Sequence, residues 1–584
     1  MDAHTGYADA SRTAADRAMR RVPLRARFSL PVAILAVLLL AFIVPPTLFL
    51  LNASLHTTRP DGSFDQLTLR FYAQLFAGPF FLESLWNTFV YAIGSALVAI
   101  TLGVIQALIV ERTDTPGRDY VFLGAIISLG VPHVLYTVGW LLLLGKAGPV
   151  NDLLHVVSGG AVGPINVYSS WGMIVIEGVS FVPMNFLLMS AVLKAVDTSF
   201  EEAAMASGAS PWRTFRTVTL AICLPGILAL LLLVFMRAFE SFEVPALVGL
   251  AGNITVLTTN IYLSAKETGA VNFGVSGAYS VCLLLIMALL LWWYHRLSRY
   301  AHRFQTITGK GYRPRVIKLG RWRWLASGIL LALFVFVIVL PIGMVIFASL
   351  QPFYEGVTVD SLGRFTLANY TSVLAPGAFR DAIWNTLILG AATATVVVPI
   401  TALCAWLAAR RHPGAWILDQ IATVSLVFPA IVMSVAFLNV FARLPVPLYG
   451  TLLSVIIAAA VRYLPYGMRF AYPGMLQIHP DLEDASAVAG AGHGRTFLRV
   501  VLPLVSTTLV GCWLFVFLAA SREVSLPLLL VGPGVEIVGP TLFELWQNGQ
   551  LTELAAMGML WVALMTVASA CFHRVAQRYR VAPV

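Results

Sequence analysis

The stretch SLPVAILAVLLLAFIVPPTLFLLN, residues 29–52, contains no charged side chain. A helix of this length, rising 1.5 Å per residue, crosses a hydrocarbon core of roughly 30 Å. It is longer than the apolar part of a signal peptide and has no clear small-residue cleavage site, so we expect an uncleaved first helix. Eleven similar blocks follow, near residues 84–110, 119–145, 170–194, 222–249, 273–295, 325–349, 384–408, 415–442, 450–475, 502–531 and 553–572. The blocks lack the alternation of barrel strands, so the sequence predicts an all-α polytopic membrane protein with twelve transmembrane helices.

The composition agrees with a membrane location, and the charge distribution predicts an orientation. The chain of 584 residues is 59% hydrophobic and only 11% charged, against roughly 25% charged residues in soluble domains. Its net charge of +10 is gathered in three segments. Basic residues precede the first block, occupy 296–324 without any acidic residue, and close the chain. Under the positive-inside rule these segments, and hence both termini, are cytoplasmic, and nucleic acid is not an expected partner.

An internal repeat divides the chain into two homologous halves of six helices. Leu67, Thr68, Leu69 and Tyr72, followed by Trp86-Asn87-Thr88, recur as Phe365, Thr366, Leu367 and Tyr370, followed by Trp384-Asn385-Thr386, at an offset of 298. Further on the offset becomes 282, because the first half has a longer loop around residues 148–170. The predicted organisation is a basic tail at 1–28, a first half at 29–295, a basic linker at 296–324, a second half at 325–572 and a tail at 573–584.

A structured loop lies between the fourth and fifth helices of each half. In the first copy, Ser199 followed by Glu202 is a capping-box pattern, Gly208 suits the end of a helix, and Pro211 suits the start of another. The second copy repeats this plan from Asp481 onward. The candidate functional residues of the two loops are Glu201, Glu202, Ala203, Gly208 and Phe215, and Glu483, Asp484, Ala485, Gly490 and Phe497.

This duplicated pattern resembles the EAA loop of binding-protein-dependent ABC importer permeases, and the whole chain from about 28 to 580 is similar to their fused ferric-iron, thiamine and phosphonate types. The resemblance implies coupling helices that dock on two cytoplasmic ATPase subunits, with carboxylates available to pair with basic groups there. It also implies a periplasmic substrate-binding protein and a bacterial inner-membrane location. The second copy departs from the pattern with Glu-Asp-Ala-Ser at 483–486. No Walker A sequence occurs, so no cofactor is expected on this chain, and ATP and Mg²⁺ belong to the partner ATPase.

Several charged residues fall inside the predicted helices, where charges are costly and usually face protein or water. These candidates for the pathway or its gate are Glu177, Arg237, Glu240, Glu243, Arg462, Arg522 and Glu523. Glu240 and Arg522 are equivalent in the repeat and opposite in charge, so they are a candidate pair across the central axis. Local pairing of each one is the alternative.

The sequence offers no catalytic or metal-binding constellation, so we expect a transport permease rather than an enzyme. His133 and His493 are isolated from other ligands, and the five cysteines lie separately in or at the ends of predicted helices. A secondary transporter of the major facilitator type, driven by an ion gradient, is the main alternative, because it also has twelve helices and a basic middle loop. The expected cargo, on resemblance, is ferric iron, with thiamine, a phosphonate or a polyamine left open.

Overall fold

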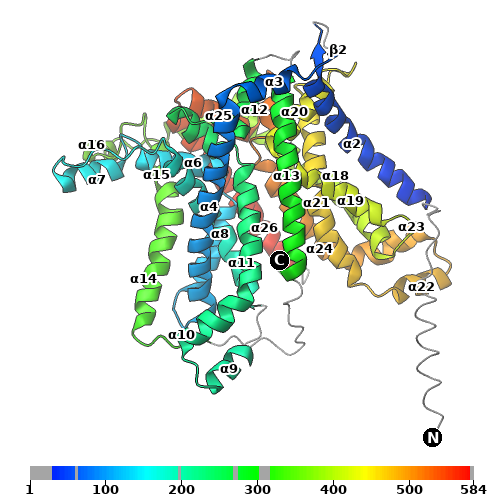
Figure 1. The fold of residues 1–584 in the computed structure, drawn as a ribbon, viewed down its shortest axis with the longest axis horizontal. Coiled ribbons are helices and arrows are strands. Elements are labelled where there is room, and N and C mark those ends of the chain that lie inside the picture. The colour runs from blue at the N-terminus through cyan, green and yellow to red at the C-terminus, as the bar shows by residue number, and fades with distance from the viewer. Residues whose placement is uncertain (1–28, 60–62, 195–198, 268–273, 302–315, 579–584) are drawn as a thin grey trace.

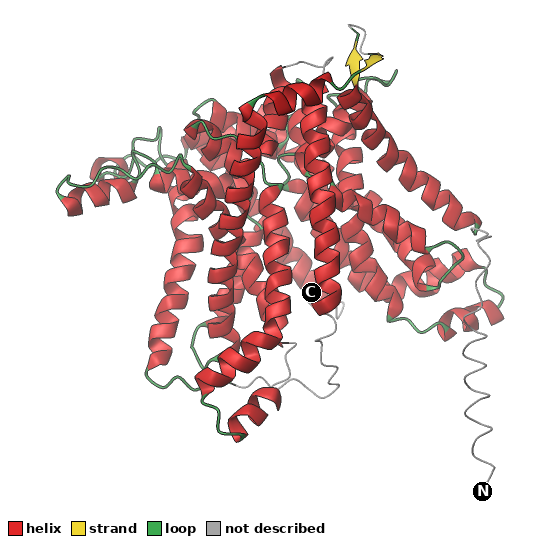
Figure 2. Cartoon of the chain, viewed as in Figure 1, coloured by secondary structure: helices red, strands yellow, loops and turns green. Residues whose placement is uncertain are grey.

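The computed structural model describes residues 29–59, 63–194, 199–267, 274–301 and 316–578. The predicted tail at 1–28, most of the predicted linker and the last residues of the predicted C-terminal tail lie outside these ranges. Helices make up most of the described chain (Figure 2). The strands found there, β1 (His56–Thr58) and β2 (Phe64–Leu67), form one antiparallel hairpin in which His56 is opposite Leu67.

Ten helices in the described residues are long and apolar enough to cross a membrane, and they confirm ten of the twelve predicted blocks. In the first half they are α2 (Leu30–Leu55), α4 (Pro79–Arg112), α8 (Ser170–Lys194), α11 (Leu220–Phe239) and α13 (Gly274–Ala301). In the second half they are α14 (Trp322–Phe334) continued by α15 (Leu340–Ser349), α18 (Ala378–Ala409), α21 (Leu452–Leu476), α24 (Leu502–Ser521) and α26 (Leu551–Arg578). A π-helical turn, η6 (Val335–Val339), joins α14 to α15.

The third predicted block of each half forms two helices separated by a break. The first half has α5 (Arg118–Leu129) and α6 (His133–Leu144), and the second has α19 (Trp416–Val424) and α20 (Ala430–Phe441), with a bend of 104° in the second pair. Pro132 and Pro429 stand directly before α6 and α20. A proline has no N–H to donate and disfavours helical backbone in the residue before it, so each helix breaks there.

The fifth helix of each half also ends earlier than predicted. After α11 the chain forms η2 (Pro245–Gly249), η3 (Leu250–Gly252) and α12 (Leu257–Glu267), and these two parts are bent by 83°. After α24 it forms η9 (Pro527–Leu529) and α25 (Val538–Gln547). The predicted blocks 222–249 and 502–531 therefore each include the first part of such a bent segment. Two bent helix pairs are also apolar and long enough to cross a membrane: Pro245–Gly252 with Leu257–Lys266, and Trp416–Val427 with Ala430–Phe441. If each pair is counted as one span, the described chain has up to twelve spans.

The repeated Asn-Thr motif, at 87–88 and 385–386, stabilises the starts of α12 and α25. Thr88 Oγ1 accepts a hydrogen bond of 3.0 Å from the Leu257 amide, which begins α12, and Thr386 Oγ1 accepts one of 2.9 Å from the Val538 amide, which begins α25. The neighbouring Asn87 donates to the Thr255 carbonyl oxygen. The first amides of a helix lack partners within it, so these buried side chains from α4 and α18 satisfy them.

The first helix of each half packs against the other half. The element α2 contacts α20, and α15 contacts α6. Contact between α15 and α6 is close, because a Cβ added at Gly139 would clash with the Pro341 carbonyl oxygen. Tyr136 Oη donates a hydrogen bond of 2.8 Å to the carbonyl oxygen of Val337. This oxygen has no partner four residues later in its own helix, because Pro341 lacks an N–H. Because the first helix of each half packs against the third helix of the other half, these contacts hold the two halves together.

Short elements mark the two ends of the bundle (Figure 1). At one end lie β2, α3 (Arg70–Ala77), α7 (Pro149–Ser158) and α16 (Val359–Leu362), and at the other lie α9 (Ser199–Ala206), α10 (Pro211–Thr214), α22 (Asp481–Val488) and α23 (His493–Thr496). The two predicted structured loops therefore lie at the same end of the molecule.

We expect Thr386→Val to lower the free energy of unfolding by about 1–3 kcal/mol, the cost of a buried donor without its partner. The valine has nearly the same shape but leaves the Val538 amide unpaired. Thermal unfolding in detergent would measure the effect. Thr566→Val is the control, because Thr566 is exposed and donates only to the Val562 carbonyl oxygen of its own helix. Equal stability of the two variants would contradict this role for Thr386.

Candidate functional site: coupling helices and a charged cluster between the halves

The two structured loops fold as pairs of short helices with a glycine between them. In the first half α9 is followed by Gly208 at φ +87° and then by α10. In the second half α22 is followed by Gly490 at φ +81° and then by α23. Glycine adopts this left-handed backbone without steric cost, which explains its place in both copies. The residues 195–198 that precede α9 are outside the described residues.

In the first half, Glu201 points into the protein and not toward solvent. It is 7% exposed, and its Oε1 lies 3.4 Å from Nη2 of Arg112, the last residue of α4. Thr219 Oγ1 donates to the same carboxylate at 2.9 Å. The same Arg112 Nη2 also donates to the Leu193 carbonyl oxygen near the end of α8. Arg112 therefore joins the second helix, the fourth helix and α9.

The second half repeats this arrangement with residues at equivalent positions. Arg410, which caps the C-terminal end of α18, donates from Nε to Glu483 Oε1 at 2.6 Å and from Nη2 to the Ile478 carbonyl oxygen at 3.1 Å. Trp406 Nε1 donates to the other oxygen of Glu483 at 3.1 Å, and its ring packs against Phe497. Arg112 and Arg410 are separated by the repeat offset of 298. The helices α9 and α22 are thus each attached to the end of the second helix of their half.

The sequence suggested that the loop carboxylates are available to a partner, and the structure divides them into two kinds. Glu201 and Glu483 are occupied inside the chain. Glu202 and Asp484 are exposed, as are Ala203 and Ala485. Whether any of these residues contacts an ATPase stays a prediction.

A second group of candidates gathers where the fifth helices end. In the first half, His133 Nε2 at the start of α6 is 2.8 Å from Glu177 Oε2 of α8, and Glu177 is fully buried. Arg237, in the last turn of α11, bonds to Glu240, which caps that helix. A cation in the last turn is favoured by the helix dipole, and its pairing offsets the unfavourable position of Glu240.

The second half contributes another set of charges around Glu523. Its Oε2 accepts a bond of 2.9 Å from Tyr463 Oη and lies 3.4 Å from Arg462 Nε. Arg462 also donates to the Phe428 carbonyl oxygen at the break between α19 and α20. Arg522 caps α24, as Glu240 caps α11.

These two sets meet between the halves. Ser525 Oγ donates a bond of 2.7 Å to Glu243 Oε1, and the two residues are equivalent in the repeat, at the offset of 282. Glu523 also lies within electrostatic range of Arg237 and Glu243. We use the name central charged cluster for a group of polar and charged residues from both halves: His133, Glu177, Arg237, Glu240, Glu243, Arg462, Tyr463, Arg522, Glu523 and Ser525. Its members lie on both halves, as expected for a site on a pathway between them.

The predicted pair of Glu240 and Arg522 is not settled by this geometry. Glu240 has a local partner in Arg237, and Arg522 lies within electrostatic range of Arg237 and Glu523. Both residues do belong to the central charged cluster. Their direct pairing stays a prediction.

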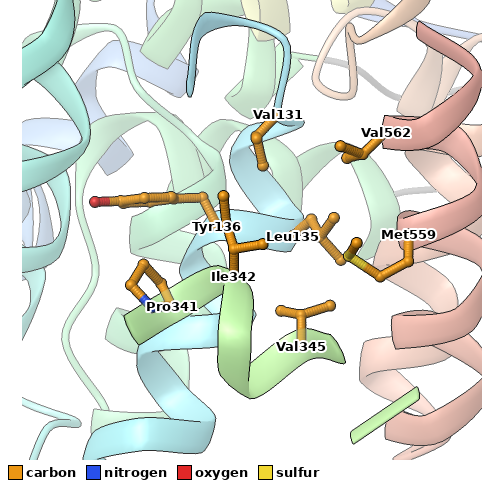
Figure 3. Close-up of a pocket in the computed structure, with 8 residues that line it drawn as sticks. All are labelled: Val131, Leu135, Tyr136, Pro341, Ile342, Val345, Met559 and Val562. Atoms are coloured by element: carbon orange, nitrogen blue, oxygen red, sulfur yellow. The ribbon is translucent and has the colours of Figure 1, made fainter. Parts of the chain in front are cut away.

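The pockets near this region are small and apolar. One lies where Val131 and Leu135 face Pro341, Val345 and Met559, between α6, α15 and α26 (Figure 3). A second lies at the equivalent place between α2 and α20. The described residues contain no group of three or more His, Cys, Asp or Glu side chains suited to a metal ion.

Sequence reasoning missed several residues of both sites. Arg112 and Arg410 could have been found, because they obey the repeat offset and flank helix ends. His133 was set aside as isolated, although its partner Glu177 is 44 positions away in sequence and adjacent in space. Tyr463 and Ser525 carry no charge, so no signal in a single sequence marks them.

Comparison with known proteins agrees with this architecture of two homologous halves. A family model described as "Binding-protein-dependent transport system inner membrane component" matches residues 27–302 and 397–581. The chain belongs to this family. It is therefore a multi-pass inner-membrane permease of an ABC importer with both copies of the domain fused, a transport component and not an enzyme. This assignment favours the importer over the major facilitator alternative.

Two relatives extend over most of the chain. The "Putative ferric transport system permease protein FbpB 1" of Haemophilus influenzae is 26% identical over 85% of this chain and 76% of its own length. The "Ferric transport system permease protein FbpB" of Actinobacillus pleuropneumoniae is 24% identical over 91% of this chain and 76% of its own length.

We expect Glu483→Gln to reduce transport roughly tenfold, because a hydrogen bond to a charged group contributes about 1.5–3 kcal/mol and this carboxylate holds α22 in place. Asp484→Asn, one residue away but exposed, is the matched control and should be neutral. Uptake in proteoliposomes, with the amount of inserted protein measured in parallel, distinguishes them. If both variants were equally active, the anchoring role would be wrong.

Within the central charged cluster, Arg462→Ala should destabilise the protein by about 3–5 kcal/mol, because it leaves the largely buried Glu523 without its cation. Adding Glu523→Gln removes that unpaired charge and should restore part of the loss. Thermal unfolding of both variants measures this. Arg364→Ala is the control, because its pair with Glu355 is exposed and should contribute about 0–1 kcal/mol. A double variant less stable than Arg462→Ala would contradict the pairing.

Proposed function

We propose that this permease imports ferric iron, delivered by a periplasmic binding protein and driven by two cytoplasmic ATPase subunits that dock on the coupling helices. The observation that carries the proposal is the duplicated anchoring of α9 and α22 by Arg112 and Arg410 at one end of the bundle. Two equivalent, rigidly held helices suit a symmetric pair of ATPase subunits.

The outward faces of the coupling helices are suited to docking. Phe200 and Leu482 are 46% and 47% exposed beside the exposed carboxylates Glu202 and Asp484. An exposed apolar side chain beside polar groups is typical of a protein interface. The inward carboxylates then transmit force while the outward residues make the contact.

A rigid connection runs from the first coupling helix toward the central charged cluster. Arg112 holds Glu201 at one end of α4, and Thr88 near the other end of α4 holds the start of α12. With 34 residues, α4 is roughly 50 Å long. Thr258 of α12 donates to the Ser241 carbonyl oxygen, between Glu240 and Glu243. A push on α9 therefore reaches residues of the cluster through one helix and three polar contacts.

Changes in the cluster would open or close the pathway. The Glu243–Ser525 bond joins the two halves directly, and the pairs Arg237–Glu240 and Arg462–Glu523 lie on either side. Rotation of the halves breaks such contacts and forms others, which is the usual basis of a two-state switch. The cluster is proposed as this gate.

Support for ferric iron as cargo comes from the two relatives, whose names describe ferric transport permeases. Reconstitution tests cargo and energy source together. We expect proteoliposomes with this chain, its ATPase and its binding protein to accumulate radioactive Fe³⁺ only with ATP. Uptake of thiamine, a phosphonate or a polyamine in its place would refute the cargo alone. Uptake that follows an ion gradient without ATP would refute the coupling mechanism.

A further inference from the structure

The helix α7 is an insertion that breaks the two-fold repeat. The connection from α6 to α8 occupies residues 145–169, whereas the equivalent connection from α20 to α21 occupies only 442–451. In Figure 1, α7 projects sideways from the end of the bundle opposite the coupling helices, farther from the centre than α14. A fold made by duplication does not require this element.

The helix is held rigidly at its base. Asn151, 4% exposed, donates to the carbonyl oxygens of Leu144, Gly145 and Ile165 and accepts from the Ile165 amide at 2.7 Å. From the second half, Tyr354 Oη donates to the Leu142 carbonyl oxygen at 3.1 Å. Such fixed backbone contacts define the direction in which α7 projects.

One face of α7 is apolar and uncovered. Leu153, Val156 and Val157 are 63%, 75% and 77% exposed, and their spacing of three and four places them on one face. Asp152 and His155 are exposed on the flank of the helix. An apolar stripe this exposed on a rigid element indicates a binding surface.

The geometry points to the lipid bilayer as the partner: we propose that α7 lies in the membrane interface, on the side opposite the coupling helices, with its apolar face among the upper acyl chains. The adjoining surface already faces lipid, because α14 and α15 form a membrane-spanning segment with exposed Leu331 and Ile346. At its base α7 follows α6, which packs against α15, so α7 begins beside one end of this membrane-spanning segment.

A docked binding protein is the other candidate, and the observations favour it less. The apolar face carries one charged residue, Asp152, at its edge, while interfaces between separately folded proteins are about as polar as other surfaces. The helix also projects away from the junction of the halves, where a binding protein has to release its cargo. Because the face has no Lys or Arg, its insertion should not depend on anionic lipid.

Spin labels on the full chain in nanodiscs test this inference. In a variant with all five cysteines replaced by serine, labels at Val156→Cys and Val157→Cys should be more accessible to oxygen, which concentrates in lipid, than to a water-soluble nickel chelate. A label at His155→Cys, about 100° around the helix from Val156, is the matched control and should show the reverse order. The pattern should be the same in neutral and anionic lipid.

Equal nickel accessibility at positions 155, 156 and 157 would mean that the helix stands in water and would overturn the proposal. Nickel accessibility at 156 and 157 that falls only when the binding protein is added would overturn it in favour of docking. If the cysteine-free chain does not fold, a photoreactive benzoylphenylalanine at 156 in the otherwise native chain replaces it. That residue should crosslink to phosphatidylcholine, whereas one at 155 should not, and crosslinking at neither position would contradict the inference.

Discussion

The structure depends on the requirement that every backbone amide and carbonyl in hydrocarbon has a hydrogen-bond partner. Straight helices meet this requirement alone, but this protein breaks its third helices and bends the chain after its fifth. At these places side chains replace the missing backbone partners. Thr88 and Thr386 accept from the first amides of α12 and α25, Arg462 donates to the Phe428 carbonyl oxygen, and Ser434 donates to the Leu526 carbonyl oxygen. The irregular segments consequently lie inside the bundle, where they bring polar groups to the junction of the halves.

Duplication explains the architecture, and divergence between the copies explains the charged cluster. The anchoring pairs of the coupling helices are retained at both equivalent positions, with arginine and glutamate in each. The cluster is different, because Glu243 is equivalent to Ser525 and Glu240 to Arg522. A chain of two identical halves would place like charges opposite each other, which is unfavourable at short distance in a low dielectric. With both halves in one polypeptide, each copy can change separately and opposite partners can meet.

Sequence reasoning predicted the helical class, the repeat and ten of the transmembrane helices, because apolar length and offset are local or periodic signals. It also located the short helices α9 and α22, since the glycines that end them act within a few residues. It missed the breaks at Pro132 and Pro429, because each lies inside an apolar block long enough for one continuous helix. It could not assign partners to Glu177, Glu201 or Glu243, since these contacts join residues far apart in the chain.

The packing of each half's first helix against the other half has a consequence for biosynthesis. The partner of α6 is α15, and Gly139 and Pro341, which meet between them, are about 200 positions apart in the chain. At roughly 5–20 residues per second, the ribosome needs on the order of tens of seconds to proceed from one to the other. During that interval the first half is in the membrane with the contact face of α6 open to lipid or to an insertion factor. The first half therefore reaches its final packing only when the second half has begun to insert.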